Sequence, residues 1–315
     1  MKNRSILRKY SAILALAVTL IVALSFEACT QEQKIAEEPT GNIITMTTKA
    51  SEEKYFTITV AGDEDIAIDW GDGKKSNLND AFRDERAGSL LFSHMYSGTT
   101  AKNIVITGNV TRLYCRESEL TALDVSESVE LTYLDCIGNL LTALDVSRNR
   151  ALTSLECSRN QLTALNVSNN TALERLFVGY NQLTALDVSK NTALTNLYVE
   201  KNKLTALDVS ENTALIVLVA GENQLTALDV SKNIELRDLH IRDNQLKSLD
   251  VSTNTALIGL YILNNQFTAS ALNDLFRTLN DVRVHGNIKD IAIGGNPGVD
   301  DSDRRIALER GWTFR

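Results

Sequence analysis

Acidic side chains recur every 21 residues through the middle of the chain, and stacked carboxylates are a chemistry that can hold calcium. Hard cations need several carboxylate oxygens. Each copy supplies one Asp with Ala and Ser around it, and Asn166 interrupts the series. We therefore expect these side chains to cap turns or face solvent and to bind no metal. The members are Asp124, Asp145, Asp187, Asp208, Asp229 and Asp250.

Three cysteines share the same spacing: Cys115, Cys136 and Cys157. Later copies place Val, Ala or Ile at this position, so the cysteines read as small apolar core residues. Disulfides form in exported proteins, but bridging geometry is poor between neighbouring parallel strands. With no second group of Cys or His, the pattern predicts buried thiols and no zinc site.

Catalytic patterns are sparse. The three histidines, His94, His240 and His285, fall in different parts of the chain. The sequence has no nucleophile elbow, glycine-rich phosphate loop or metal-binding His pair. A glycosidase-like carboxylate pair is compatible with the composition, but a regular repeated surface offers no obvious pocket. We expect a protein that is not an enzyme and has no cofactor.

A third set of residues has the chemistry of recognition. One position of the repeat varies while its surroundings stay constant, and it reads Tyr114, Asp135, Glu156, Phe177, Tyr198, Val219, His240 and Tyr261. Exposed aromatics among Arg and acids are enriched in binding hot spots. The alternative is neutral drift on a strand surface that favours aromatics in any case. We predict that a variable strip binds a partner: Tyr114, Asp135, Glu156, Arg175, Phe177, Tyr198, His240 and Tyr261.

The repeat that positions these residues runs from about 110 to 266. Residues 194–214 are one copy, with a first arm at 194–202 and a second arm that begins at Leu204, and each arm follows L-x-x-L-x-V-x-x-N. The second arm repeats Leu-Thr-Ala-Leu-Asp-Val-Ser almost unchanged. Leu and Val should point inward. A single 21-residue coil buries too little to fold alone, so coils must stack on their neighbours.

Two asparagine columns end the arms, also 21 residues apart. We expect their amides to turn inward and satisfy backbone groups that would otherwise be buried without partners. The first column is Asn139, Asn160, Asn181, Asn202, Asn223, Asn244 and Asn265, and the second is Asn149, Asn170, Asn191, Asn212, Asn233 and Asn254.

This pattern resembles the leucine-rich-repeat family, in the variety whose coils have two arms. The overall resemblance is to secreted or lipid-anchored leucine-rich-repeat proteins of the Bacteroidetes type, with internalin-like proteins as more distant relatives. It implies a β-rich solenoid of about eight 21-residue repeats, with a small N-terminal β-sandwich cap and a C-terminal helical cap. It also implies a cell-envelope protein whose variable strip engages a partner.

The N-terminus has the form of an export signal. Basic residues precede an apolar run at about 11–26, and Ala28 stands before Cys29. We predict a signal peptide at 1–28, with an uncleaved anchor helix as the alternative. Cys29 resembles the lipid-modified cysteine of bacterial lipoproteins, although Phe26 and Glu27 depart from that pattern, so cleavage by an ordinary signal peptidase stays open. Residues 29–41 are polar and acidic and should form a flexible tether.

Residues 42–109 differ in style, with five candidate strands between polar turns, as in a small β-sandwich. They are Ile43–Thr47, Tyr55–Val60, Ile66–Trp70, Leu90–Tyr96 and Asn103–Thr107. The sequence Asp-Trp-Gly-Asp-Gly at 69–73, with His94 and Tyr96 later, resembles the polycystic-kidney-disease-type (PKD) immunoglobulin-like module. That resemblance implies a spacer or adhesive domain. We expect Asp69 and Asp72 to form a tight turn rather than a metal site.

Residues 267–315 break the period and should cap the open end of the core. We expect a helix at 269–279 with Ser270 as N-cap, strands at 282–285 and 288–293, and a short helix at 301–310. Trp312 and Phe314 should then fold back onto the core.

The charge limits the partner class. The net charge is −8, and removing residues 1–28 takes away four basic and one acidic side chain, which leaves −11. Nucleic-acid binding needs clustered Lys and Arg, so no nucleic acid is expected. The predicted partner is a protein of a host or bacterial surface, or a glycan, and a spacer without a specific partner is the third option. We expect a monomer at the outer membrane or cell surface that meets the membrane only through a lipid at Cys29, or a secreted or periplasmic protein if Cys29 is not lipidated.

Overall fold

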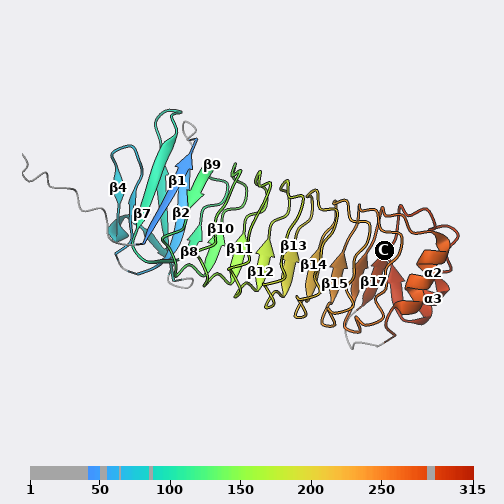
Figure 1. Cartoon of the computed structure of the whole chain (residues 1–315). Coiled ribbons are helices and arrows are strands. Elements are labelled where there is room, and N and C mark those ends of the chain that lie inside the picture. Colours follow the sequence, from blue (N-terminus) through green and yellow to red (C-terminus); the bar gives the residue numbers. More distant parts are fainter. Residues whose placement is uncertain (1–41, 50–54, 64, 85–87, 282–287) are drawn as a thin grey trace, which may run out of the picture. The chain divides into compact units, whose positions relative to one another are not determined.

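The computed structural model describes residues 42–49, 55–63, 65–84, 88–281 and 288–315, which belong to one compact unit (Figure 1). The predicted signal peptide, Cys29 and the tether lie outside the described residues, as do the strand expected at 282–285 and His285. Within the described ranges, no helix combines the length and apolar character needed to cross a membrane.

The repeat forms a β-solenoid of about nine turns at a spacing of about 21 residues. The first arms supply short parallel strands that pair in register with those of the next coil. These strands are β10 (Tyr133–Asp135), β11 (Ser154–Glu156), β12 (Arg175–Phe177), β13 (Asn196–Tyr198), β14 (Val217–Val219), β15 (Asp238–His240) and β16 (Gly259–Tyr261). They are the middle of a 13-stranded sheet.

Both arms deliver apolar side chains to one continuous core, as the repeat predicts. In one coil, Leu194, Leu197 and Val199 of the first arm are completely buried, and so are Leu204 and Val209 of the second. The second arms after 124 are not strands, because each turns at its Asp. The Asp187 carboxylate, for example, accepts a hydrogen bond from the Ser189 backbone N–H at 2.9 Å. The Asp column therefore caps turns, which confirms the interpretation as turn residues.

The first asparagine column ties consecutive coils together, as expected. The Asn181 Nδ2 donates to the carbonyls of Cys157 and Val178 at 3.1 and 3.0 Å. Its Oδ1 accepts from the Leu162 N–H at 3.0 Å. The second column differs in one respect: Asn191 Nδ2 donates to two carbonyls, but its buried Oδ1 has no hydrogen-bond partner in the described structure.

The N-terminal residues contribute strands to two sheets, and all five expected strands are present. Their final bounds are β1 (Ile43–Thr48), β2 (Tyr55–Gly62), β3 (Ala67–Asp69), β6 (Ser89–Met95) and β7 (Lys102–Thr107). The structure adds β4 (Lys75–Ser76), β5 (Phe82–Asp84) and the 3₁₀ helix η1 (Leu78–Asp80).

Both sheets continue into the first coil without a linker. Strand β8 (Val110–Tyr114) pairs antiparallel with β2 on one side and parallel with β10 on the other. Strand β9 (Leu120–Asp124) pairs antiparallel with β1. The N-terminal residues therefore cover the open edge of the first coil, which would otherwise present unpaired backbone groups. The division at 109 and 110 stays a prediction, since no change of sheet marks it.

The residues that resemble the PKD-type motif contact one another. The His94 ring stacks on Trp70 with centroids 4.9 Å apart, and its Nε2 lies 2.8 Å from the Asp72 carboxylate. The Tyr96 hydroxyl donates to the Trp70 carbonyl at 2.9 Å. Asp69 accepts from the Gly71 N–H at 3.0 Å, as a tight turn requires.

The C-terminal cap contains α2 (Ala269–Thr278), β17 (Lys289–Ala292), α3 (Arg305–Glu309) and β18 (Trp312–Phe314). The expected N-cap at Ser270 is wrong, because Thr268 caps α2 by accepting from the Ala271 N–H. The second helix is shorter than expected. The Trp312 side chain is buried, and β18 pairs with β17, so the chain end folds back onto the core as predicted.

Candidate interaction surface

The register of the sheet brings the variable strip into one row. Tyr114 pairs with Asp135, Asp135 with Glu156, and Glu156 with Phe177. The row continues through Tyr198, Val219, His240 and Tyr261. Adjacent strands lie about 4.8 Å apart, so each side chain of the row lies beside those of the coils before and after it. Most of the row is therefore half-buried by its own members rather than freely exposed.

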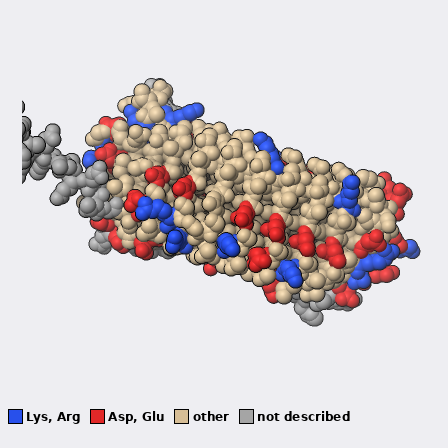
Figure 2. Space-filling model, viewed as in Figure 1, with Lys and Arg blue, Asp and Glu red and all other residues tan. Residues whose placement is uncertain are grey.

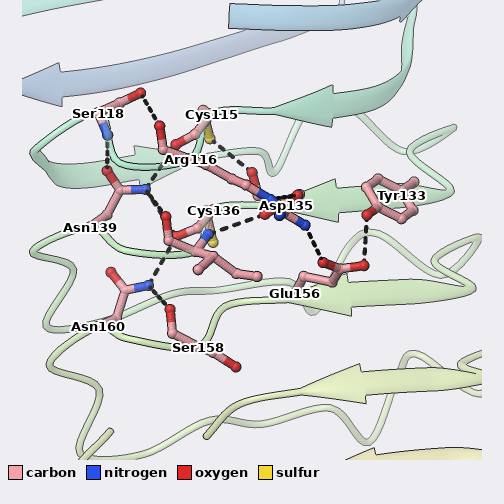
Figure 3. Close-up of polar contacts among 11 residues, drawn as sticks. Cys115, Arg116, Ser118, Tyr133, Asp135, Cys136, Asn139, Glu156, Ser158 and Asn160 are labelled. Atoms are coloured by element: carbon pink, nitrogen blue, oxygen red, sulfur yellow. Dashed lines mark hydrogen bonds and ion pairs between the residues drawn. The ribbon is translucent and has the colours of Figure 1, made fainter. Parts of the chain in front are cut away.

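One end of the row is an ionic cluster, shown in Figure 3. Arg116 lies between two carboxylates: it pairs with Asp135 and donates to Glu156 at 2.7 Å. The Tyr133 hydroxyl donates to the other Glu156 oxygen at 2.6 Å. Asp135 is completely buried under this cluster. Arg116 is therefore the exposed member of the cluster, and the buried Asp135 is the support that holds it.

Burial raises the pKa of the Asp135 carboxyl, and the Arg116 guanidinium partly offsets that effect. Burial and the hydrogen bond to Glu156 likewise raise the pKa of Tyr133. The Tyr114 ring lies 4.7 Å from that of Tyr133, and the Arg112 guanidinium lies 5.6 Å from the centre of the Tyr133 ring. The N-terminal end of the strip is thus an ordered group of Arg, Tyr and Glu.

Two stacked ring pairs form the rest of the row. Phe177 and Tyr198 lie 4.4 Å apart at an interplanar angle of 13°. His240 and Tyr261 lie 4.2 Å apart at 17°. Within each pair the rings cover one face of each other. Burial also lowers the pKa of His240.

The C-terminal cap supports the far end of the row. The Tyr261 hydroxyl hydrogen-bonds to the Asp290 carboxylate at 3.0 Å. Arg315 forms an ion pair with the same carboxylate, and its guanidinium lies 6.0 Å from the Tyr261 ring centre. Among the predicted strip residues, Arg175 differs, since it stands exposed at the start of β12.

A second row escaped the sequence analysis. The residue before each Asn of the first column has a left-handed backbone, with φ from 52° to 57° at Arg159, Tyr180, Lys201, Glu222, Asp243 and Asn264. Arg159 and Lys201 lie 4.4 and 4.8 Å from the centre of the Tyr180 ring, on neighbouring coils. Lys201 pairs with Glu222 at 3.3 Å. The sequence could have predicted this second variable row, because the position varies from copy to copy while the Asn that follows it is constant.

Charged side chains are unevenly distributed over the surface. Figure 2 shows Lys, Arg, Asp and Glu side chains gathered in a band that follows the stack of coils, while much of the viewed face is neutral. Across the described residues, no group of three or more His, Cys, Asp or Glu side chains is placed to hold a metal ion. Cys115, Cys136 and Cys157 are buried free thiols, as the sequence predicts. The described side chains of the variable strip therefore interact through ring stacking, hydrogen bonds and ion pairs.

Comparison with known proteins yields structural neighbours. No protein-family model and no curated protein matches the chain. The functional domain of InlJ from Listeria monocytogenes, a structure that includes a cysteine ladder, is 31% identical with a TM-score of 0.49, over 64% of this chain and 47% of that chain. A leucine-rich-repeat protein of Leptospira interrogans is 21% identical with a TM-score of 0.51, over 62% of this chain and 58% of that one. Internalin C2 of Listeria monocytogenes is 22% identical with a TM-score of 0.49, over 53% and 77%.

The match spans less than two thirds of the first two of these structures. The Leptospira structure supports the fold alone, and that fold is the leucine-rich-repeat solenoid that the 21-residue period predicts.

Proposed function

We propose that this chain is a protein-binding module of the cell envelope and that the variable strip is its contact surface. The observation that supports the proposal is the difference between the two arms. Outward positions of the second arm repeat Thr and Ala in coil after coil. Outward positions of the first arm carry Tyr, Arg, Glu, His and Phe, and hydrogen bonds and ring stacking hold them in place. Preorganised side chains of these types bind with little loss of conformational entropy.

Ring geometry favours a protein over a glycan. A sugar binds an aromatic side chain by stacking on the face of the ring. In the pairs of Phe177 with Tyr198 and His240 with Tyr261, one face of every ring is already covered by its partner. The edges of stacked rings and the Arg and Glu side chains beside them suit the mixed polar and apolar surface of a protein. A glycan-binding role is the second candidate, and a spacer is the third.

The location belongs to the same proposal. A signal peptide at 1–28, lipidation of Cys29 and a tether to residue 41 would place the solenoid outside the cytoplasm on a flexible anchor. We also propose that the chain is a lipoprotein of the Bacteroidetes type and that residues 42–109 are a PKD-like spacer. No catalytic role is proposed, and a monomer is expected.

The test uses the whole chain and two variants as bait for identified surface proteins and for a glycan array. The strip variant carries Phe177→Ala, Tyr198→Ala, His240→Ala and Tyr261→Ala. The matched control carries three exposed second-arm changes in the same part of the solenoid: Thr184→Ala, Thr205→Ala and Thr226→Ala. Circular dichroism checks that both variants are folded.

A protein that binds the chain and the control variant but not the strip variant supports the proposal. Charge reversal at Arg175 or Glu156 should then weaken binding, and the affinity should fall with salt. A glycan that is lost on aromatic truncation with little salt dependence supports the second candidate instead. Equal binding by the strip and control variants removes the strip from consideration.

The anchor has its own test. The Cys29→Ser change should release the chain from the membrane fraction and abolish labelling with a radioactive fatty acid. If the wild-type chain takes up no fatty acid, Cys29 is not lipidated and the secreted or periplasmic form stands.

A further inference from the structure

The sheet that carries the variable strip does not end at the first coil. Strand β8 pairs with β2 (Figure 1), β2 pairs with β6, and β6 pairs with β5, all within the same 13-stranded sheet. The register places Tyr114 of the strip opposite Thr59. It then places Thr59 opposite Leu91, and Leu91 opposite Phe82. The row of the strip therefore continues across three strands of the N-terminal residues.

The outward side of these three strands exposes large apolar side chains. Alternate residues of a strand share a side, and the inward set, such as Ile58 and Phe92, is buried. On the outward side, Tyr55 is 65% exposed, Phe82 70% and Met95 48%, and Tyr55 and Met95 are cross-strand partners. The outward residues, called the module face, are Tyr55, Thr57, Thr59, Phe82, Asp84, Leu91, Ser93 and Met95, of which Asp84 carries the charge.

The charges exposed on the adjoining part of the strip are positive. Arg112 stands exposed on β8 and Arg175 on β12, and neither pairs with a carboxylate of a described residue. The Arg116 side chain is 53% exposed, whereas its partners Asp135 and Glu156 are 0% and 14% exposed. Guanidinium groups therefore lie beside the apolar module face. Tyr, Phe, Met and Arg are the residue types that are enriched in protein interfaces.

The strip by itself is smaller than a standard protein interface. Its strands of three residues are about 10 Å long, and β8 to β16 span about 34 Å, which gives an area of about 340 Å². A standard interface buries about 800 Å² on each partner. Strands β2 and β6 have eight and seven residues. With β5 they add a region of about 14 by 23 Å that is continuous with the strip and nearly doubles its area.

We propose that the protein partner of the strip also binds the module face, with apolar side chains over Tyr55, Phe82 and Met95 and with acidic side chains at Arg112 and Arg175. Burial of the apolar side chains supplies most of the affinity, and guanidinium–carboxylate pairs at its border fix the orientation. This inference rests on the proposed function. It states the chemistry of the partner surface and gives residues 42–109 a contact role besides that of a spacer.

The probe is a phage-displayed library of random 12-residue peptides, selected on the whole chain. An extended peptide of this length reaches about 40 Å, which covers the distance of about 29 Å from β5 to β12. Enriched peptides should combine Asp or Glu with Leu or aromatic residues. Synthetic copies should bind in fluorescence anisotropy with dissociation constants on the order of 10 μM, and the affinity should fall with salt.

Three chain variants locate the peptides, and all of them change exposed side chains, so circular dichroism should be unchanged. The face variant carries Tyr55→Ser, Phe82→Ser and Met95→Ser. The matched control replaces three exposed apolar residues that lie outside the sheet, through Val129→Ser, Ile234→Ser and Leu308→Ser. The charge variant carries Arg112→Gln and Arg175→Gln. The face variant should bind the peptides at least about tenfold more weakly. The charge variant should bind more weakly with less dependence on salt, and the control should bind as the unchanged chain does.

Equal binding by the face variant and the unchanged chain overturns the inference, and so does a selection that enriches no peptide or only peptides without acidic residues. The proposed function is decided by its own test. If the face variant still captures a protein that the strip variant loses, the module face is not part of the interface while the strip remains the contact surface. If the strip variant also captures that protein, the proposed function itself fails.

Discussion

The two asparagine columns should differ in their contribution to stability, although they look alike in the sequence. Asn181 and Asn191 end the first and the second arm of the same coil, and the same change to Ala can be made at each. Asn181→Ala removes two good hydrogen bonds to carbonyls and the bond accepted from Leu162. Each carbonyl keeps a second amide donor from an adjacent Asn. The Leu162 N–H has no other acceptor in the described structure and becomes buried without a partner.

Three lost hydrogen bonds at about 1 kcal/mol each, with about 1 kcal/mol more for the unpaired N–H, give a loss of about 4 kcal/mol for Asn181→Ala. Asn191→Ala loses two bonds, to Val167 and Asn170. Both carbonyls retain a backbone donor. The change also removes an unpaired buried amide oxygen, so the net loss is about 1 kcal/mol. Side-chain volume lost is the same, so cavity effects largely cancel.

The assay is equilibrium unfolding in urea followed by circular dichroism. The free energies of unfolding are compared only if both variants have the same dependence on urea concentration. Asn181→Ala should be less stable than Asn191→Ala by about 3 kcal/mol. An equal or larger loss for Asn191→Ala would refute the reasoning, because it would mean that the second-column oxygen has a partner or that hydrogen-bond count does not govern these bends.

Three further outcomes are expected. Gly138→Ala should lower the free energy of unfolding by about 1–2 kcal/mol in the same urea assay, because φ is 72° and the new Cβ would lie 2.9 Å from the Glu117 side chain. Gly98→Ala is the control: φ is 102° there but the space is open, so its loss measures backbone strain without the steric contact. Arg116→Met should cost on the order of 3 kcal/mol at pH 7.5, because it leaves the buried Asp135 carboxylate without its cation. Burial raises the pKa of Asp135, so this carboxylate binds a proton more tightly in the folded chain than in the unfolded chain. The penalty should therefore shrink as pH falls through that raised pKa, and a penalty that grows on acidification would contradict the assignment. In a Cys29→Ser chain, Ellman's reagent should react with no thiol in the folded state and with three thiols after unfolding. The three thiols are buried, and burial raises the pKa of Cys157 to about 12. A fast reaction in the folded chain would disprove this burial. The three are Cys115, Cys136 and Cys157.

Much of the solenoid could be predicted because its causes are local and repeated. A 21-residue period of Leu and Val can bury its apolar side chains only by stacking, and an Asn at each bend has few roles other than pairing with the backbone. The variable strip followed from the same alignment, since alternate residues of a strand share a face. Pairing across coils then followed from a repeat without insertions, and the register confirms it.

Other features depend on contacts between adjacent coils, which the sequence of one repeat does not reveal. Asp135 looks like an outward strip residue in the sequence, but Arg116 of the preceding coil covers it completely. The row containing Tyr180 and Lys201 depends on a left-handed turn that places each side chain over the next coil. Thr268 rather than Ser270 caps α2, because the path of the last coil decides where the helix begins.

The sequence by itself determined the repeat, the inward and outward sides of each arm and the positions of the asparagines, because these follow from side-chain polarity at a constant period. Only the tertiary structure decided which outward residues remain accessible. Coils stack about 4.8 Å apart, less than the length of an Arg, Tyr or Glu side chain, so each such side chain lies over its neighbours. Accessibility is therefore a property of adjacent coils together: their stacking buries Asp135 and pairs the rings of Phe177 and Tyr198.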